Sequence, residues 1–182
     1  MQTVIARHME LLQVTTSCEP IVFTCGDDDL DDFIMNDSKQ YHQSLLAETF
    51  LLKSGDDALA YFTLLNDKIS AESFDDKASF NRFRKRLFVN SKRLRAYPSI
   101  KIGRLAVQKG HARKGYGSNL LDLIKILIMS NRYSGCRFMT VDAYKDAVPF
   151  YEKNGFVRIS ESVSSKDTCL MVYDLLTVAV QS

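Results

Sequence analysis

The feature that most constrains the fold is a predicted strand that passes through a glycine-rich turn into a predicted helix. SIKIGRLAV, residues 99–107, has the apolar and β-branched residues of a strand, and Gly103 interrupts its alternation. A glycine at such a place indicates a bulge or a close backbone approach. The turn QKGHARKGYGSNLL, residues 108–121, has three glycines within eight residues. The helix that follows has apolar residues spaced to bury one side, namely Leu120, Leu121, Ile124, Leu127 and Ile128.

This arrangement predicts an anion site, because the first N–H groups of a helix have no intrahelical acceptor and glycine lets a ligand approach the main chain. Gly115 and Gly117 supply the open backbone, and three neighbouring side chains supply positive charge. These side chains are Lys109, Arg113 and Lys114. A nucleoside triphosphatase loop is excluded, because Tyr116 and Gly117 stand where it needs Lys and Ser or Thr. A dinucleotide fingerprint is excluded as well, because Leu120 stands at its third glycine position.

The remaining patterns predict a mixed α/β domain built around one sheet. PIVFTC at 20–25 is a strand or an entry loop, and the aspartates from Asp27 to Asp29 begin a helix whose apolar face is spaced over Leu30–Leu46. ETFLLKS and ALAYFTLLN form a hairpin around GDD. A second buried strand covers 136–144, a short helix covers 147–154 and ends at Gly155, and two antiparallel strands follow. We expect a single domain over 1–182 with an insertion at about 67–98, and Pro98 to end whatever precedes it.

Charge is distributed unevenly along the chain. Residues 19–76 carry 14 acidic and 3 basic side chains, whereas residues 77–104 carry 10 basic and no acidic ones. Four aromatic residues lie within this basic segment 77–104: Phe80, Phe83, Phe88 and Tyr97. Four readings are open: a nucleic-acid surface, a partner of the acidic half within the chain or in a homodimer, a site for coenzyme phosphates, and a solvated helical face with buried phenylalanines.

Cysteine usage and hydropathy indicate the compartment. The four cysteines form no C-x-x-C pair and no metal-ligand spacing with the three histidines, so we expect reduced thiols and no metal site. No run reaches about 18 apolar residues, and the N-terminus MQTVIARHMELL lacks the apolar run and cleavage site of a signal peptide. We therefore expect a cytoplasmic protein.

Three segments together resemble the GCN5-related N-acetyltransferase (GNAT) family. GRLAV and ARKGYGSNLL are similar to the strand and the [QR]-x-x-G-x-[GA] turn that wraps the pyrophosphate of acetyl-coenzyme A, with Ala112 at the usual Gln or Arg position. FYEKNGF, at 150–156, resembles a second family segment. FTCGDDDLDDFIMND, at 23–37, resembles the first helix of a subgroup that includes toxin-type acetyltransferases.

The resemblance implies a role for each matched residue. The main chain of Leu105, Ala106 and Val107 would hold the pantetheine arm. The pyrophosphate would lie on the turn formed by Ala112, Arg113, Lys114, Gly115, Tyr116, Gly117 and Ser118. Tyr151 would be the general acid that protonates the departing thiolate, because a phenol with a pKa of about 10 suits a thiolate of about 8.5–10. The strand before the turn has no carboxylate to act as a base, and Glu72, Asp142 and Glu48 are candidates elsewhere.

The implied activity is acetyl-coenzyme A-dependent N-acetylation of an amine by direct attack. A toxin-type enzyme that acetylates aminoacyl-tRNA is one alternative, since the amine of an α-amino ester has a low pKa and needs no strong base. A second alternative is a non-catalytic module that binds acyl-coenzyme A and signals through a partner. No membrane is implied, and nucleic acid would bind through residues 77–104.

Overall fold

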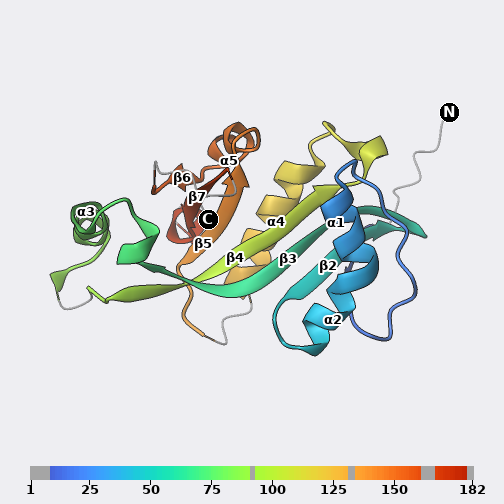
Figure 1. The fold of residues 1–182 in the computed structure, drawn as a ribbon, viewed down its shortest axis with the longest axis horizontal. Coiled ribbons are helices and arrows are strands. Elements are labelled where there is room, and N and C mark those ends of the chain that lie inside the picture. The colour runs from blue at the N-terminus through green and yellow to red at the C-terminus, as the bar shows by residue number, and fades with distance from the viewer. Residues whose placement is uncertain (1–8, 91–92, 131–133, 161–166, 180–182) are drawn as a thin grey trace. The chain divides into compact units, whose positions relative to one another are not determined.

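The computed structural model describes residues 9–90, 93–130, 134–160 and 167–179 (Figure 1). The chain divides into two compact units, of which unit 1 is Met1–Leu65 with Gly103–Leu120 and unit 2 is Asn66–Ile102 with Leu121–Ser182. The strands of the described residues have the order β1-β2-β3-β4-β5-β7-β6. Their bounds are β1 Met9–Gln13, β2 Glu48–Ser54, β3 Asp57–Ser70, β4 Ala96–Val107, β5 Phe138–Tyr144, β6 Val157–Arg158 and β7 Thr168–Asp174.

The α-helices are α1 Asp28–Asp32, α2 Ser38–Gln43, α3 Lys77–Leu87, α4 Tyr116–Ser130, α5 Val148–Lys153 and α6 Leu176–Ala179. A π-helix, η1 Phe33–Asp37, joins α1 to α2, and the 3-10 helices are η2 Ala71–Ser73 and η4 Lys109–His111. β4 and β5 are parallel, whereas β1–β2, β2–β3, β5–β7 and β6–β7 are antiparallel. The predicted mixed α/β class is confirmed, and the sheet is mostly antiparallel. Within the described ranges, no helix is long and apolar enough to cross a membrane.

In unit 1, residues of η1 share a buried core with residues of β2, β3 and β4. Asp27 caps α1 as predicted, because its carboxylate accepts from the N–H groups of Asp29 at 3.1 Å and Leu30 at 3.2 Å. The buried core of this unit is Val14, Phe23, Phe33, Ile34, Leu51, Tyr61 and Ala106. Each large side chain buried there contributes about 1.5–3 kcal/mol of hydrophobic stabilisation. The hairpin of β2 and β3 is confirmed, and residues 20–25 form a loop.

Unit 2 is held together by an aromatic core. Its buried members are Ile69, Phe80, Phe83, Tyr97, Phe138 and Val172, and Phe88 packs against them. The aromatic residues of the basic segment therefore lie inside this unit, as the reading of a helical face with buried phenylalanines predicts, and are not free to stack on bases. β4 pairs with β5 through Ser99–Lys101, and β5 pairs with β7 along its whole length.

Three expectations about these elements were wrong. Pro98 lies inside β4 and does not end a segment, because its side chain is exposed and a strand tolerates a missing N–H at such a position. Leu45 and Leu46 do not extend the buried helical face, because α2 ends at Gln43 and both side chains are more than half exposed. β3 also continues beyond Asn66 to Ser70, whereas the strand predicted from ALAYFTLLN ends at Asn66.

Candidate coenzyme site and catalytic tyrosine

The predicted coenzyme residues form one continuous stretch of unit 1, at the end of β4. Ala106 is buried in the core, while Leu105 and Val107 are partly exposed. The Gln108 N–H donates to the carbonyl of Leu59 at 2.8 Å, and the Lys109 N–H donates to the carbonyl of Thr24 at 2.8 Å. These two bonds fix the position at which the chain leaves the strand.

The turn between β4 and α4 presents open backbone. Residues 112–115 are exposed, and Arg113 and Gly115 have φ values of 60° and 86°. The left-handed conformation of Arg113 costs about 1–2 kcal/mol for a residue with a Cβ, and the sequence contained no signal for it. A Cβ built on Gly115 would meet no atom within 4 Å. The main chain at Gly115 is therefore open, as it also is at Gly55.

The start of α4 provides donors for an anion. Its first regular hydrogen bond runs from the Asn119 N–H to the Gly115 carbonyl at 3.1 Å. N–H groups earlier in the turn thus lack an acceptor four residues back, and the helix dipole adds about half a positive charge there. The Lys114 Nζ donates to the Gly110 carbonyl at 2.8 Å, which holds its charge over the turn. Tyr116 packs edge-on against His111, with ring centroids 5.4 Å apart.

Tyr151 lies in unit 2, on α5. Pro149 occupies the first turn of this helix, as predicted, and Gly155 ends it with a φ of 86°. Phe150 and Phe156 pack edge-on against the Tyr151 ring, at centroid distances of 5.1 and 5.4 Å. Burial raises the pKa of Tyr151 to about 12. The phenol thus keeps its proton at neutral pH.

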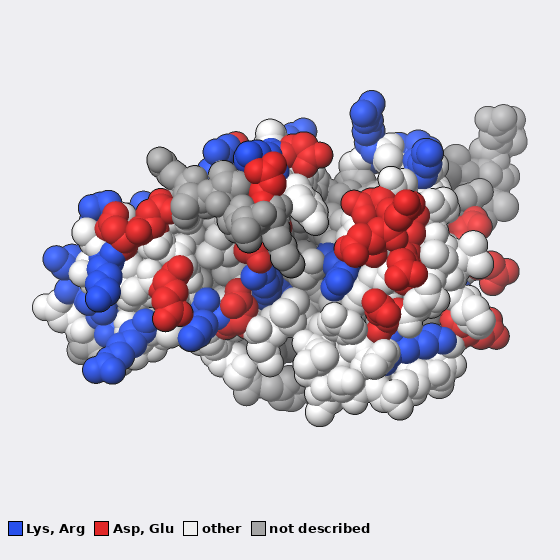
Figure 2. All heavy atoms as spheres, in the orientation of Figure 1, with Lys and Arg blue, Asp and Glu red and all other residues white. Residues whose placement is uncertain are grey.

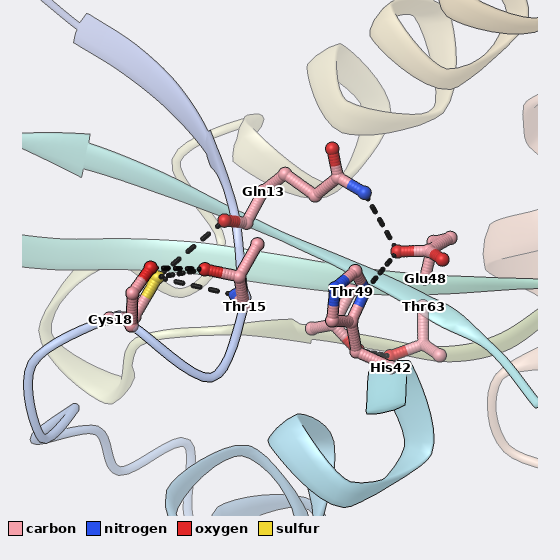
Figure 3. A network of polar contacts seen from close by, with 8 residues as sticks. Gln13, Thr15, Cys18, His42, Glu48, Thr49 and Thr63 are labelled. Carbon is pink, nitrogen blue, oxygen red and sulfur yellow. Dashed lines mark hydrogen bonds and ion pairs between the residues drawn. The ribbon is translucent and has the colours of Figure 1, made fainter. Parts of the chain in front are cut away.

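Of the three candidate bases, two carboxylates are engaged. Glu48, in unit 1, accepts from the Gln13 amide at 2.7 Å and contacts the His42 Nδ1 at 2.7 Å (Figure 3). Asp142, in unit 2, forms an ion pair with the Lys101 Nζ at 2.5 Å. Glu72 is exposed in η2. In the part of the chain that the structure describes, no group of three or more His, Cys, Asp or Glu could hold a metal ion, and the four cysteines are free.

Two polar residues of unit 1 were missed by sequence reasoning. Arg104 on β4 stacks its guanidinium over the Phe33 ring, with Cζ 3.6 Å from the ring centroid. Asp31 is buried in α1 and accepts from the Cys25 N–H at 2.8 Å and the Thr24 hydroxyl at 2.9 Å. Neither position could be identified from spacing, because each depends on a contact between separate segments.

Comparisons with known proteins identify the family and the fold. A family model described as "Acetyltransferase (GNAT) domain" matches residues 70–175. A comparison with curated proteins found no match. A crystal structure of a mutant of KacT superposes with a TM-score of 0.76 at 20% identity, covering 96% of this chain and 99% of that one.

Two other similar structures are of AtaT. AtaT complexed with acetyl-methionyl-tRNAfMet has a TM-score of 0.75 at 17% identity, with 96% of this chain and 99% of that one covered. AtaTR bound with AcCoA has a TM-score of 0.73 at 17% identity, with 95% and 97% covered. At these identities the structural likeness shows the fold alone. Because the family model spans more than half of the sequence and the fold agrees with it, the chain belongs to the GNAT acetyltransferase family.

Proposed function

We propose that this protein transfers the acetyl group of acetyl-coenzyme A to an amine by direct attack of the amine nitrogen on the thioester. The observation that carries the proposal is the open turn in front of α4, where Gly115 borders empty space and the first helical N–H groups lack regular acceptors. Membership in the GNAT family supports it.

The coenzyme would be held by residues of unit 1. The main chain of Leu105–Val107 pairs with the pantetheine amides as an added strand would. Residues 112–118 receive the pyrophosphate on their N–H groups, and the charge of Arg113 adds to the helix dipole. Ala112 contributes its backbone only. The coenzyme supplies an acetyl thioester, whose C–S bond breaks as the C–N bond forms.

Tyr151 acts as the general acid that gives its proton to the departing sulfur. Burial keeps the phenol protonated before the reaction, since its pKa is about 12. This pKa is above the value of about 10 on which the expected match with the thiolate rested, so burial makes the phenol a weaker acid than the sequence predicted. The phenolate is then reprotonated by the proton that the acceptor nitrogen loses, which balances the transfer.

The acceptor amine has to be neutral before it attacks. β4 has no carboxylate, and Glu48 and Asp142 are held by neighbouring side chains. These contacts favour an acceptor with an intrinsically low amine pKa over a mechanism with a strong base. An α-amino ester, the linkage in aminoacyl-tRNA, is such an acceptor.

A toxin-type enzyme that acetylates aminoacyl-tRNA is therefore the second candidate. The structure of AtaT with acetyl-methionyl-tRNAfMet, although only 17% identical, favours it. So does the surface of α3 in unit 2, where Lys77, Arg82, Lys85 and Arg86 are exposed and take part in no ion pair with another described residue (Figure 2). Lys92, also in the basic segment, lies outside the described residues. Such charges suit an RNA backbone.

The test is acetyl transfer from labelled acetyl-coenzyme A to a panel of small amines, peptides and aminoacyl-tRNAs. Tyr151→Phe is expected to lower kcat by about 10²–10³. Tyr144→Phe, which changes an exposed tyrosine of β5 in the same way, is the matched control and should leave kcat unchanged. Equal rates for wild type and Tyr151→Phe would show that Tyr151 is not the general acid.

Two further outcomes separate the candidates. Growth arrest on expression that Tyr151→Phe abolishes would support the toxin-type enzyme, and unaffected growth would count against it. If the coenzyme binds but no acceptor is acetylated, the protein is instead a non-catalytic module that binds acyl-coenzyme A. Sedimentation at several concentrations tests the predicted homodimer.

A further inference from the structure

Arg104 is held against the helical layer of unit 1 by aromatic rings. It lies on β4 between Ile102 and Ala106, which are buried on the same face because side chains alternate along a strand. Its guanidinium carbon is 3.6 Å from the Phe33 centroid and 5.7 Å from that of Tyr41. The stacking fixes the plane of the guanidinium and leaves its in-plane N–H groups to bind something else.

Within the described residues, this guanidinium has no hydrogen-bond acceptor and no anionic partner. Its Nε atom is buried and makes no hydrogen bond. The buried acid of unit 1, Asp31, is engaged by Cys25 and Thr24, and Asp27 caps α1. By contrast, Arg137 in unit 2 is paired with a carboxylate: its Nε and Nη2 donate to Asp174 at 3.0 and 2.7 Å.

A partly buried cation without an anion is unfavourable, and cation–π stacking offsets only part of the cost. An arginine fixed in this way has the geometry for two-point binding of an oxyanion, which a lysine lacks. Phe33 begins the π-helix η1, and such segments are frequent at functional sites. The aromatic support and the unused donors together indicate a site for an anion that comes from outside the chain.

We propose that Arg104 binds a phosphodiester of the acceptor, of the kind that lies next to the aminoacylated end of a tRNA. This proposal rests on the proposed function. Arg104 directly precedes Leu105–Val107, the strand segment assigned to the pantetheine arm, and is separated along the chain from the turn at 112–118 assigned to the pyrophosphate. The absence of a carboxylate on β4 favours an aminoacyl ester acceptor, which carries phosphodiesters.

The first experiment needs no activity. The 15N–1H signal of the Arg104 Nε is assigned by its loss in Arg104→Gln and followed while inorganic phosphate is added to the wild-type protein. We expect a saturating shift that sodium chloride at matched ionic strength does not produce. No shift up to about 100 mM phosphate, or an equal shift with acetate, would overturn the proposal, the second by making the ligand a carboxylate.

The second experiment compares an aminoacyl-tRNA with an aminoacyl-adenosine that has the same ester and amine but no phosphodiester. Arg104→Gln is expected to raise KM for the aminoacyl-tRNA by about ten- to a hundredfold, as for loss of a hydrogen-bonded charge pair. KM for aminoacyl-adenosine and for acetyl-coenzyme A should stay unchanged. Lys68→Gln removes an exposed charge on β3 and is the matched control.

The outcomes separate this proposal from the function on which it rests. If wild type acetylates neither acceptor, the aminoacyl-tRNA candidate fails, while the phosphate titration still reports on Arg104. If Arg104→Gln raises KM for acetyl-coenzyme A instead, the anion belongs to the coenzyme and the proposal is wrong. Arg104→Lys keeps the charge without the planar fork and should give an intermediate KM, and thermal unfolding shows that both variants fold.

Discussion

Replacing Gly115 by alanine tests the coenzyme turn directly. Gly115 has a φ of 86°, a conformation that costs a residue with a Cβ about 1–2 kcal/mol. Alanine recovers about 0.4–1 kcal/mol by restricting the unfolded chain, so the net loss of stability is about 1 kcal/mol. For a chain of 182 residues this lowers Tm by about 2–4 °C. The new methyl group meets no protein atom within 4 Å, so nothing else in the protein has to move.

Gly55→Ala is the matched control for this change. Gly55, in the turn between β2 and β3, also has a positive φ, 62°, and also has open space at its Cβ position. The two variants should therefore lose similar stability in thermal unfolding. Isothermal titration with coenzyme A should separate them, because only at Gly115 would the methyl group stand where a pyrophosphate approaches the backbone.

The expected result is a Kd for coenzyme A at least about tenfold higher in Gly115→Ala, equivalent to about 1.4 kcal/mol, and an unchanged Kd in Gly55→Ala. Equal affinity in both variants would refute the reasoning, because the empty space beside Gly115 would then have no ligand. A loss of affinity in both would show that the effect comes from general destabilisation.

Three other predictions follow from the contacts of single residues. Asp31→Asn should lower stability by about 1–3 kcal/mol, because Asp31 accepts two hydrogen bonds while buried. Burial alone would raise the pKa of Asp31, but the hydrogen bonds from Cys25 and Thr24 outweigh it and lower the pKa. The stabilisation is therefore lost as pH falls below about 3.8. In urea unfolding, the stability of the variant should depend less on pH in this acid range than that of wild type. Gly103→Val should be destabilising by at most about 1 kcal/mol, because the Leu65 Cδ2 that would lie 2.7 Å from the new Cβ is the end of a flexible side chain, and Leu65→Ala should restore that loss in the double variant. Burial raises the pKa of Tyr151 to about 12 against about 10 in the unfolded chain, so the stability linked to its proton is complete below pH 10 and is lost between pH 10 and 12. Tyr151→Phe should remove that part of the alkaline slope.

Residues whose roles depend on near neighbours could be predicted from the sequence. The cap at Asp27, the hairpin around Gly55 and the end of α5 at Gly155 all follow from local backbone chemistry. The glycine turn before α4 belongs to the same class, because glycines next to a helix start present open N–H groups whatever the rest of the chain does. At Gly103 the sequence left open a bulge or a close backbone approach, and the atom that would lie 2.7 Å from a Cβ there belongs to the Leu65 side chain.

The segment boundaries that were wrong have a different cause. Leu45 and Leu46 have the spacing of a helical face, but the chain ends α2 before them and turns into β2, so no core reaches them. From the sequence alone Pro98 is expected to end the segment before it, yet a strand tolerates proline where the missing N–H would face solvent. In each case the tertiary environment decides whether a local preference is followed.

The sequence by itself determined the strand–turn–helix, the family to which it points and the side chain proposed as the acid, because these depend on residue type and short spacing. Only the tertiary structure decided which charged side chains have a partner and which do not. It pairs Glu48 with His42 and Asp142 with Lys101, and it stacks Arg104 on Phe33 with its Nε unbonded. The physical reason is that a charge depends on the groups within a few ångströms of it, and packing between segments, not order along the chain, determines those neighbours.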